Sequence, residues 1–364
     1  MWRWENWRNS AFRWCGLAGL ALALLVSGLL AARLGLSLAV VGVLAALACA
    51  VFFALAILNQ VIIGRDRLVY YHHEIAIFAI AGAALALMRA PVLPYLDLAA
   101  LGLAAFLACG RIGCLLTGCC HGRPFRWGVR YTRQKSPAGF LKALAGVRLA
   151  PVQLFEALWT AGALVAGIRL ALHDAPPGGV FSMYLAVYGL GRFVFEFLRG
   201  DPDRRYLLGF SEAQWTSLVL MAGCAAAEAL GLLPWNPYHV AAASAAGAAM
   251  LLVLVTDNAD RRLFLPRHIC QVAQALEDTR NEASAGDLYI AQTAQGVHIS
   301  ASVVPAAEIF SFSRAGESFS AAAARRFALL IVRLRRAPEQ FEFLKGERGV
   351  WHLVLPGEGR AHGV

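Results

Sequence analysis

The sequence predicts an all-α polytopic membrane protein with about seven or eight transmembrane helices, followed by a small soluble α+β domain. Hydrophobic residues make up 59% of the chain and charged residues 15%, against about 25% charged residues in ordinary soluble domains. The apolar residues gather in runs of about 20, the length of helix that crosses a ~30 Å hydrocarbon core. These runs stop near Thr256, and charges of both signs follow.

Each apolar run is expected to form a spanning helix. The third is the weakest, because it is short and begins with a carboxylate. The first is retained as a helix rather than a cleaved signal, since its apolar core is long and more spans follow. The eight runs are Phe12–Ala32, Leu36–Ile62, Glu74–Met88, Leu96–Leu116, Leu154–Leu172, Val180–Leu198, Ala213–Leu232 and Val240–Val255.

This change in composition divides the chain into a transmembrane domain, residues 1–256, and a soluble domain of unknown role, residues 257–364. Within the second part, helical periodicity and alternating apolar residues indicate short elements separated by turns. The expected elements are a short helix at Ile269–Glu277, two strands in Asp287–Val304 around Gln295-Gly296, a helix at Ser320–Arg336, and closing strands in "QFEFL" and "GVWHLVL".

The eight cysteines do not indicate a disulfide framework, because five of them lie in apolar runs, where free cysteine behaves as a small hydrophobe. Cys119, Cys120 and His121 are the one metal candidate. Adjacent ligands strain a tetrahedral site and no partner CxxC or HxxxH follows. We therefore expect no metal and no cofactor.

Ionisable residues at membrane depth indicate a functional site. They are Arg111, Glu156 and a group of three, Arg192, Glu196 and Arg199, which share one helical face by their spacing. One interpretation is structural ion pairing, with terminal arginines reaching the interface. The other is an anionic headgroup site, because three arginines exceed two glutamates and guanidinium groups match phosphate oxygens.

Three histidines are candidates for a general base. His72 and His73 stand at the start of the third run beside Glu74, which would orient an imidazole and make it more basic. His121 lies next to the arginine loop. The alternative interpretation is that each is an ordinary polar residue at the membrane interface.

The segment "GRIGCLLTGCCHGRP" resembles the signature loop of the bacterial prolipoprotein diacylglyceryl transferase family. Cys114 and Thr117 replace the signature asparagines, and Cys119 replaces its glutamate. Four further segments match in the family's order and extend the resemblance from about Tyr70 to Gly223. They are "YHHEIAIF", "APVQLFEA", "YGLGRFVFEFLRGDPD" and "GFSEAQWTSLVLMAG".

The resemblance implies transfer of a diacylglyceryl group from phosphatidylglycerol to the thiol of a lipobox cysteine. It implies catalytic roles for His72, Arg111 and Arg192, with the two arginines holding the phosphate and the histidine as base, although the match leaves His72, His73 and His121 open for that role. The implied substrate-binding positions are His73, Gly113, Gly118, His121, Gln153, Glu156, Glu196 and Arg199.

The expected partners are an anionic phospholipid, phosphatidylglycerol, and a prolipoprotein; the partner of the soluble domain is unknown. Nucleic acid is not expected, since the soluble part has no basic patch interleaved with aromatic residues. The expected location is the bacterial cytoplasmic (inner) membrane. The alternative function is a non-catalytic phospholipid-binding or transporter-like protein with a soluble interaction domain.

Basic residues cluster in one set of loops, together with both termini, and positive charge marks the cytoplasmic side. The family's counterpart loop faces outward. Either basic residues that bind the headgroup distort the count of positive loop charges, or this chain works from the other face of the membrane. The charges near both termini favour the second interpretation.

Overall fold

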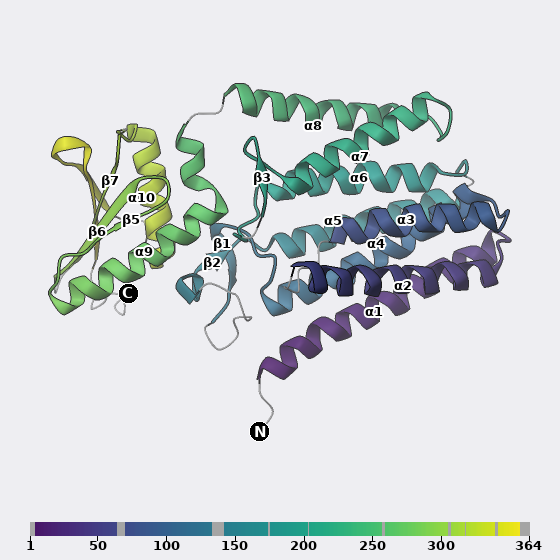
Figure 1. Cartoon of the computed structure of the whole chain (residues 1–364), viewed down its shortest axis with the longest axis horizontal. Coiled ribbons are helices and arrows are strands. Elements are labelled where there is room, and N and C mark those ends of the chain that lie inside the picture. Colours follow the sequence, from purple (N-terminus) through teal and green to yellow (C-terminus); the bar gives the residue numbers. More distant parts are fainter. Residues whose placement is uncertain are drawn as a thin grey trace.

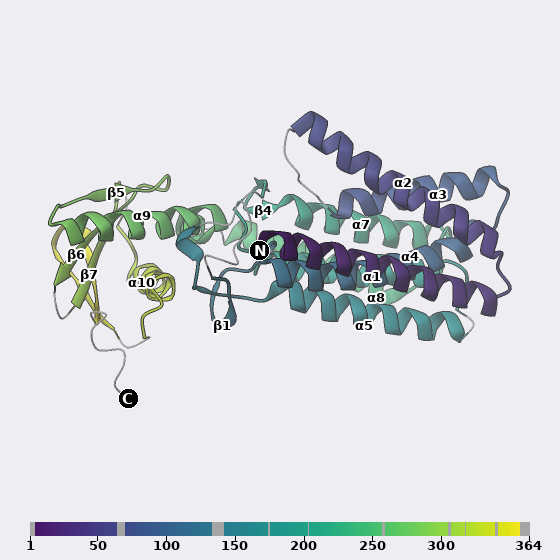
Figure 2. The ribbon, with the colours of Figure 1, turned by 90° about the horizontal axis from the view of Figure 1, so that it is seen from below.

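The computed structural model describes residues 4–63, 70–132, 142–173, 175–202, 204–256, 259–304, 307–316, 318–338 and 341–356. The molecule is elongated, with a bundle of long helices at one end and a compact α+β unit at the other (Figure 1). The helices of the bundle run up and down along its length, and the view from below shows the same two parts (Figure 2).

A helix forms at each of the eight apolar runs. The helices are α1 (Trp4–Arg33), α2 (Leu38–Ile63), α3 (Tyr70–Leu87), α4 (Val92–Thr117), α5 (Val152–Leu172), α6 (Gly179–Glu196), α7 (Glu212–Ala229) and α8 (Pro237–Val255).

Six of these helices are long and apolar enough to cross a membrane, so the predicted count of seven or eight is slightly too high. The two others are α6 and α7, each 18 residues long. Their buried faces include the charged side chains of Arg192, Glu196 and Glu228, which lower the mean hydropathy. Because both helices pack against other helices, these charges face protein rather than lipid.

Helix α4 packs closely against α1, and small residues make the approach possible. A Cβ on Gly19 would lie 3.0 Å from the Cβ of Cys109, and one on Gly102 would lie 2.9 Å from Ser27 Oγ. Small residues at such crossings let helix backbones come together in a membrane. The C-terminal end of α4, where the signature segment begins, is therefore held firmly in the bundle.

The C-terminal unit is a five-stranded antiparallel sheet in the order β5-β6-β7-β9-β8, with two helices against its buried face. A 3-10 segment, η3 (Ala259–Phe264), leads into it, and another, η4 (Glu347–Gly349), joins its last two strands. The remaining elements are α9 (Pro266–Ala285), β5 (Ile290–Gln292), β6 (Val297–Val304), β7 (Ala307–Arg314), α10 (Ala321–Arg335), β8 (Glu342–Lys345) and β9 (Trp351–Pro356).

The predicted hairpin around Gly296, the helix after Ser320 and the two closing strands all form. Gly296 adopts φ +71°, a left-handed conformation that favours glycine at the turn. Ser320 caps α10 by accepting a hydrogen bond from the Ala323 N–H. The helix expected at Ile269–Glu277 is longer, and strand β7 was not expected; its serines alternate with Phe310 and Phe312, a pattern typical of a half-buried strand.

The two parts share a core. Tyr131, Leu144, Val147 and Leu149, from the connection between α4 and α5, belong to the same buried cluster as the inner faces of the C-terminal sheet and helices. That connection contains β1 (Pro124–Arg130), η2 (Lys142–Leu144) and β2 (Arg148–Leu149). A second hairpin, β3 (Tyr206–Leu207) with β4 (Phe210–Ser211), lies at the same end. The division of the chain at residues 256 and 257 stays a prediction.

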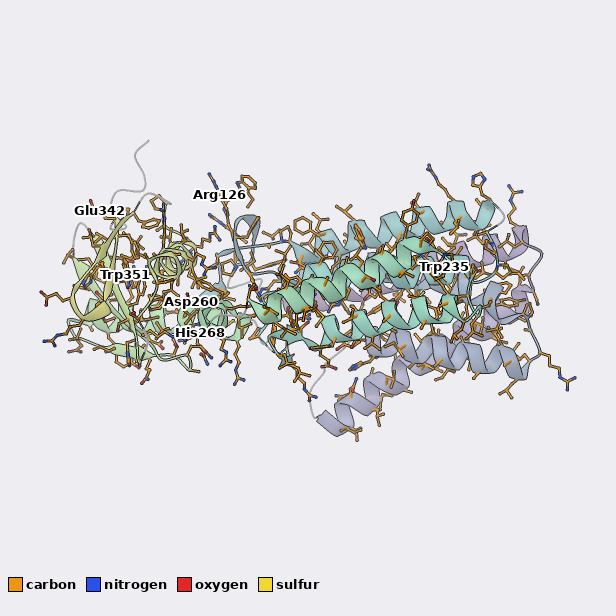
Figure 3. All side chains as sticks on the ribbon, turned by 90° about the horizontal axis from the view of Figure 1, so that it is seen from above. Arg126, Trp235, Asp260, His268, Glu342 and Trp351 are labelled. Carbon is orange, nitrogen blue, oxygen red and sulfur yellow. The ribbon has the colours of Figure 1, made fainter. Side chains whose placement is uncertain are left out.

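Figure 3 shows Arg126 of β1 beside the C-terminal unit and Trp235 at the opposite end of the bundle. The start of α1 and the signature segment lie at the end of the bundle nearest the C-terminal unit (Figure 1). Some basic residues that entered the topology argument lie outside the described residues: Arg3, Arg65, Arg67, Arg133 and Lys135.

We expect the C-terminal unit to lie in the cytoplasm, because it shares the end of the bundle that carries most loop lysines and arginines. Green fluorescent protein fused after Val364 should fluoresce, and alkaline phosphatase fused there should be inactive. The same reporters inserted after Arg89, at the opposite end, are the matched control and should give the reverse pattern. Active phosphatase after Val364 would show that the basic loops do not report topology.

Candidate functional site

Glu156 is the centre of a buried charge cluster at the end of the bundle nearest the C-terminal unit. Its side chain projects from the first turns of α5 and is 6% exposed. Its Oε2 lies 2.8 Å from Arg111 Nε, and its Oε1 lies 2.6 Å from Arg192 Nη1 and 3.5 Å from Arg199 Nη1. One carboxylate thus bridges three arginines from three segments: α4, α6 and the turn after α6.

A second layer of ion pairs holds the arginines from α6 in place. Arg192 Nη2 lies 2.7 Å from Glu196 Oε1, one helical turn later. Arg204 also pairs with Glu196 and lies 2.8 Å from Asp201, which Arg199 Nε contacts at 2.8 Å. Although burial raises it, the charges of Arg199 and Arg204 bring the pKa of the Asp201 carboxyl below its usual range. Asp201 therefore stays ionised at neutral pH.

Arg111 differs from its neighbours in keeping part of its guanidinium group uncommitted. Arg199 uses Nε and both Nη nitrogens on Glu156 and Asp201. Arg111 contacts Glu156 through Nε, and within the described residues neither of its Nη nitrogens makes a hydrogen bond or ion pair. These two nitrogens form the donor edge that a phosphate can occupy with two parallel hydrogen bonds.

The signature segment is tied to the turn after α6 by backbone hydrogen bonds. Arg123 N donates to Leu198 O, and Gly200 N donates to His121 O, both at 2.9 Å. A Cβ on Gly200 would lie 2.3 Å from Gly122 O, so only glycine allows this contact. The pairing brings the segment after Arg111 against the segment that carries Arg199.

The two glycines expected to approach a headgroup have local structural roles. A Cβ on Gly113 would lie 3.0 Å from the Cβ of Cys15 on α1. Gly118 adopts φ +81° at the C-terminal cap of α4, and a Cβ there would lie 2.8 Å from the ring of Tyr131. Helix packing and helix capping account for both glycines without a ligand.

From the sequence, Cys119 and Cys120 were grouped only with His121 as a metal candidate. The structure brings a third, because Cys114 lies one helical turn back and the chain reverses at Gly118. The sulfur atoms of Cys114, Cys119 and Cys120 lie within 4.8 Å of one another. Gln153, at the start of α5, donates from Nε2 to Cys119 O at 2.7 Å and so anchors this loop.

On α3, the two adjacent histidines and the following glutamate point in different directions. His72 is half exposed, and its Nε2 lies 3.1 Å from Glu212 of α7. His73 is 1% exposed, and its ring packs 5.0 Å from that of Phe52 on α2. Glu74 is 2% exposed, and it lies within electrostatic reach of Arg192 and Arg111.

Three tyrosines surround Glu74. Tyr70 is one turn earlier on α3, and Tyr184 and Tyr188 of α6 stack with ring centroids 5.5 Å apart. All three interact electrostatically with Glu74. Of the three consecutive side chains on α3, Glu74 is therefore the one directed at the charge cluster.

His121, the third candidate base, is buried at the edge of the cluster. Its Nδ1 lies 2.9 Å from Gly122 O. Burial lowers the pKa of its imidazole, which is therefore neutral at pH 7. Because a carbonyl oxygen can only accept, Nδ1 carries the hydrogen in this contact and Nε2 is the basic nitrogen of the neutral ring.

Three members of the cluster were not among the site residues predicted from the sequence: Glu74, Asp201 and Arg204. Asp201 lies within the matched "YGLGRFVFEFLRGDPD" segment and Arg204 follows it directly, and their charges at the end of a span were the available signal. The sequence showed that Glu74 follows the two histidines. The direction of its side chain depends on how α3 is rotated about its own axis, and the apolar sequence of α3 does not define that rotation.

This architecture defines a polytopic membrane protein with a buried, arginine-rich charge cluster at one end of its helix bundle. The model of the family described as prolipoprotein diacylglyceryl transferase matches residues 6–229, which include all eight charges of the cluster. The chain belongs to that family.

Curated relatives agree with this assignment. The phosphatidylglycerol–prolipoprotein diacylglyceryl transferase of Clostridium tetani is 35% identical over 127 residues, 35% of this chain and 49% of that protein. Transferase 2 of Clostridium perfringens is 36% identical over 132 residues, 36% of this chain and 50% of the relative. The chain thus spans about half the length of the curated relatives it matches. No solved structure gives a significant match.

Replacement of Arg111 by alanine should abolish most phospholipid binding, because it removes two guanidinium nitrogens that have no partner among the described residues. Loss of a charge-assisted contact to phosphate in a dry site costs on the order of 3 kcal/mol, or about a hundredfold in affinity. Phosphatidylglycerol binding to protein in phosphatidylcholine nanodiscs would measure this. Arg111→Lys should retain part of the affinity.

Arg169→Ala is the matched control, since Arg169 is an exposed arginine near the other end of α5. It should bind phosphatidylglycerol as the unmodified chain does. Thermal unfolding would show whether Arg111→Ala remains folded. Unchanged binding in a folded Arg111→Ala protein would contradict the assignment.

We expect the three-thiol cluster to hold no zinc, because adjacent cysteines strain tetrahedral coordination. Elemental analysis of the purified chain should find well under one zinc per molecule. A Cys119→Ser/Cys120→Ser variant, with Cys49→Ser as the matched thiol control, should have the same content. One zinc per chain that disappears only in the double variant would disprove this expectation.

Proposed function

We propose that this protein transfers a diacylglyceryl group from phosphatidylglycerol to a thiol, the acceptor being the lipobox cysteine of a prolipoprotein in the bacterial inner membrane. The observation that carries the proposal is the open Nη edge of Arg111 inside a cluster of buried ion pairs. Family membership adds the reaction class, since the curated relatives are named for this transfer.

In the proposed reaction, the acceptor thiolate attacks the glycerol carbon of the diacylglyceryl group. A C–S bond forms, the C–O bond to phosphate breaks, and glycerol phosphate leaves with the electron pair. Charge builds up on the phosphate oxygens as that bond breaks, and Arg111 would stabilise it through both Nη nitrogens. Arg192 and Arg199, which are paired with Glu156, Glu196 and Asp201, would position Arg111 and Glu156.

The thiol must lose its proton, and we propose Glu74 as the group that takes it. The carboxylate lies on the face of α3 directed at Arg111 and Arg192, whereas His72 pairs with Glu212 and His73 packs on Phe52. The resemblance places the family's histidine at His72 or His73, depending on a one-residue choice of match, and does not itself assign a role to Glu74. A general base in contact with the acceptor contributes about a hundredfold or more to the rate.

The second candidate function is phospholipid binding without transfer. The replacement of three polar signature positions by Cys114, Thr117 and Cys119 favours it, because Cys119 Sγ contacts Thr117 Oγ1 and the backbone oxygen of Cys114, within the loop itself. Only a turnover measurement separates the two candidates.

Glu74→Gln should lower the transfer rate about a hundredfold while phosphatidylglycerol binding is retained, because the amide keeps the shape of the carboxylate but cannot accept the thiol proton. The assay follows transfer from labelled phosphatidylglycerol to a peptide that contains a lipobox. His72→Ala and His73→Ala are compared in the same assay. His72→Ala should remain within a few-fold of the unmodified rate.

Two results would change the assignment of the base. An inactive His72→Ala or His121→Ala protein with an active Glu74→Gln protein would return the role to that histidine. Absence of transfer by the unmodified chain, with binding intact, would favour the phospholipid-binding alternative.

A further inference from the structure

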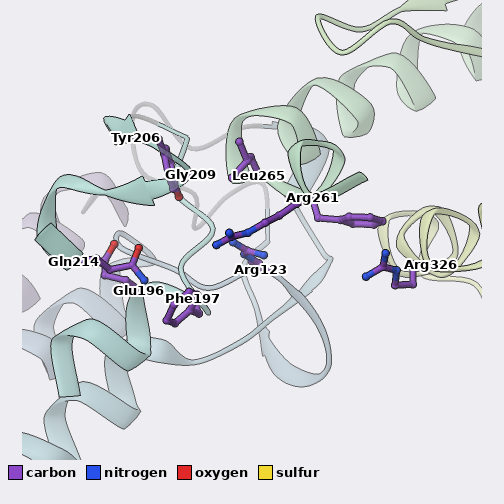
Figure 4. A pocket seen from close by; sticks show the side chains of 10 residues that line it. Arg123, Glu196, Phe197, Tyr206, Gly209, Gln214, Arg261, Leu265 and Arg326 are labelled. Atoms are coloured by element: carbon purple, nitrogen blue, oxygen red, sulfur yellow. The ribbon is translucent and has the colours of Figure 1, made fainter. Parts of the chain in front are cut away.

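A cavity of about 320 Å³ lies between the end of the bundle and the C-terminal unit. Arg123, Glu196 and Tyr206 line it from the bundle side, and Arg261 and Arg326 line it from the C-terminal side (Figure 4). Its volume is within the usual range for small-molecule sites, roughly 300–1,000 Å³. The two arginines of the C-terminal side lie beyond residue 229, where the family match ends.

The charges around this cavity do not balance. Glu196 is the one carboxylate in the lining, and it is already engaged by Arg192, Arg204 and the Ser211 hydroxyl. Among the described residues, no carboxylate lies within ion-pair distance of Arg123, Arg261 or Arg326. Three guanidinium groups therefore surround the cavity without a counter-charge of their own.

These guanidinium groups are held in place by other contacts. Arg261 lies over the ring of Phe210, 5.1 Å from its centroid, and Arg326 lies over Phe264 at 5.2 Å. Arg123 donates from Nε to Arg199 O at 3.2 Å. Stacking on the rings holds the planar faces of the Arg261 and Arg326 guanidinium groups. Their N–H edges are therefore left to donate hydrogen bonds to a ligand.

Two signs indicate that an anion is missing. Arg261 Nη1 is buried and has no hydrogen-bond partner among the described residues, a situation that costs free energy unless a ligand fills it. The pKa of Arg123 is lowered by burial and also by the charge of Arg261, so the two like charges repel each other across the cavity. An anion between them would satisfy the donor and relieve the repulsion.

We propose that this cavity binds the phosphate of a glycerol phosphate, held between Arg123, Arg261 and Arg326 with the Tyr206 hydroxyl at its side. The choice of glycerol phosphate, rather than another phosphate ester, rests on the proposed transferase function. Glu196 borders both the cavity and Arg192, so the cavity lies next to the cluster from which the leaving group departs. The same chemistry is present in an intact lipid headgroup and in the released glycerol phosphate.

The test uses the full chain in the Arg111→Ala background, which removes the phosphate edge of the other site. Calorimetry with glycerol 1-phosphate should show one binding site per chain. Adding Arg261→Ala or Arg326→Ala should weaken that binding about tenfold or more, the effect of losing one charge-assisted contact. Arg262→Ala and Arg325→Ala, exposed arginines adjacent in sequence to each position, are the matched controls and should not weaken it.

A second arm identifies the source of the phosphate. Nanodiscs containing phosphatidylglycerol or only phosphatidylcholine are compared for binding of the same variants. Dependence of phosphatidylglycerol binding on Arg261 would identify the occupant as a lipid headgroup. If only glycerol 1-phosphate binding depends on Arg261, the occupant is the free leaving group. Either result supports an anion site.

Equal binding by Arg261→Ala, Arg326→Ala and their controls would overturn the proposal. Arg261→Lys keeps the charge and is the control for loss of binding through misfolding. It should bind glycerol 1-phosphate more tightly than Arg261→Ala does. The outcome is separate from that of the proposed function. If the protein transfers lipid but Arg261→Ala still binds glycerol 1-phosphate, only the cavity site is disproved. If binding requires Arg261 but no lipid is transferred, only the transferase function is disproved.

Discussion

The bridging of three arginines by the single carboxylate of Glu156 is the interaction on which the rest of the site depends. Three guanidinium groups this close repel one another, and burial strengthens the repulsion because the surroundings screen it poorly. Glu156 joins α4, α5 and the end of α6 at one point. Removing one partner of a buried ion pair typically costs about 3–5 kcal/mol, so the same contact that prepares an anion site also fixes the helices relative to one another.

Around this centre, most donors are consumed and few are left for a ligand. Arg199 is fully used by Glu156 and Asp201, while Arg111 retains an open edge. The site therefore combines a rigid, neutralised scaffold with one free guanidinium edge, an arrangement that limits reorganisation when a phosphate arrives. The C-terminal unit lies against the same end and contributes Arg261 and Arg326 to the adjoining cavity, so this unit is structurally close to the lipid chemistry we propose.

Sequence patterns defined much of this structure. Apolar run length located all eight helices of the bundle, and charge at membrane depth located Arg111, Glu156, Arg192, Glu196 and Arg199 as one site. What could not be predicted depends on contacts between distant segments. The apolar run of α3 has no marked amphipathic face, so nothing in it indicates that Glu74, rather than His72, is directed at Arg111. Cys114 joins Cys119 and Cys120 only because the chain reverses at Gly118, and the arginine cavity exists only where the C-terminal unit meets the bundle.

The central claim is that the buried arginines serve bond breaking in a phospholipid rather than binding alone. The most direct measurement uses phosphatidylglycerol with an isotopic label in its terminal glycerol, incubated with the full chain and a lipobox peptide, followed by mass spectrometry of all products. The account predicts that the peptide gains the unlabelled diacylglyceryl group while the label appears in glycerol phosphate, in equal amounts. Intact phosphatidylglycerol bound to the protein, with neither product formed, would contradict it.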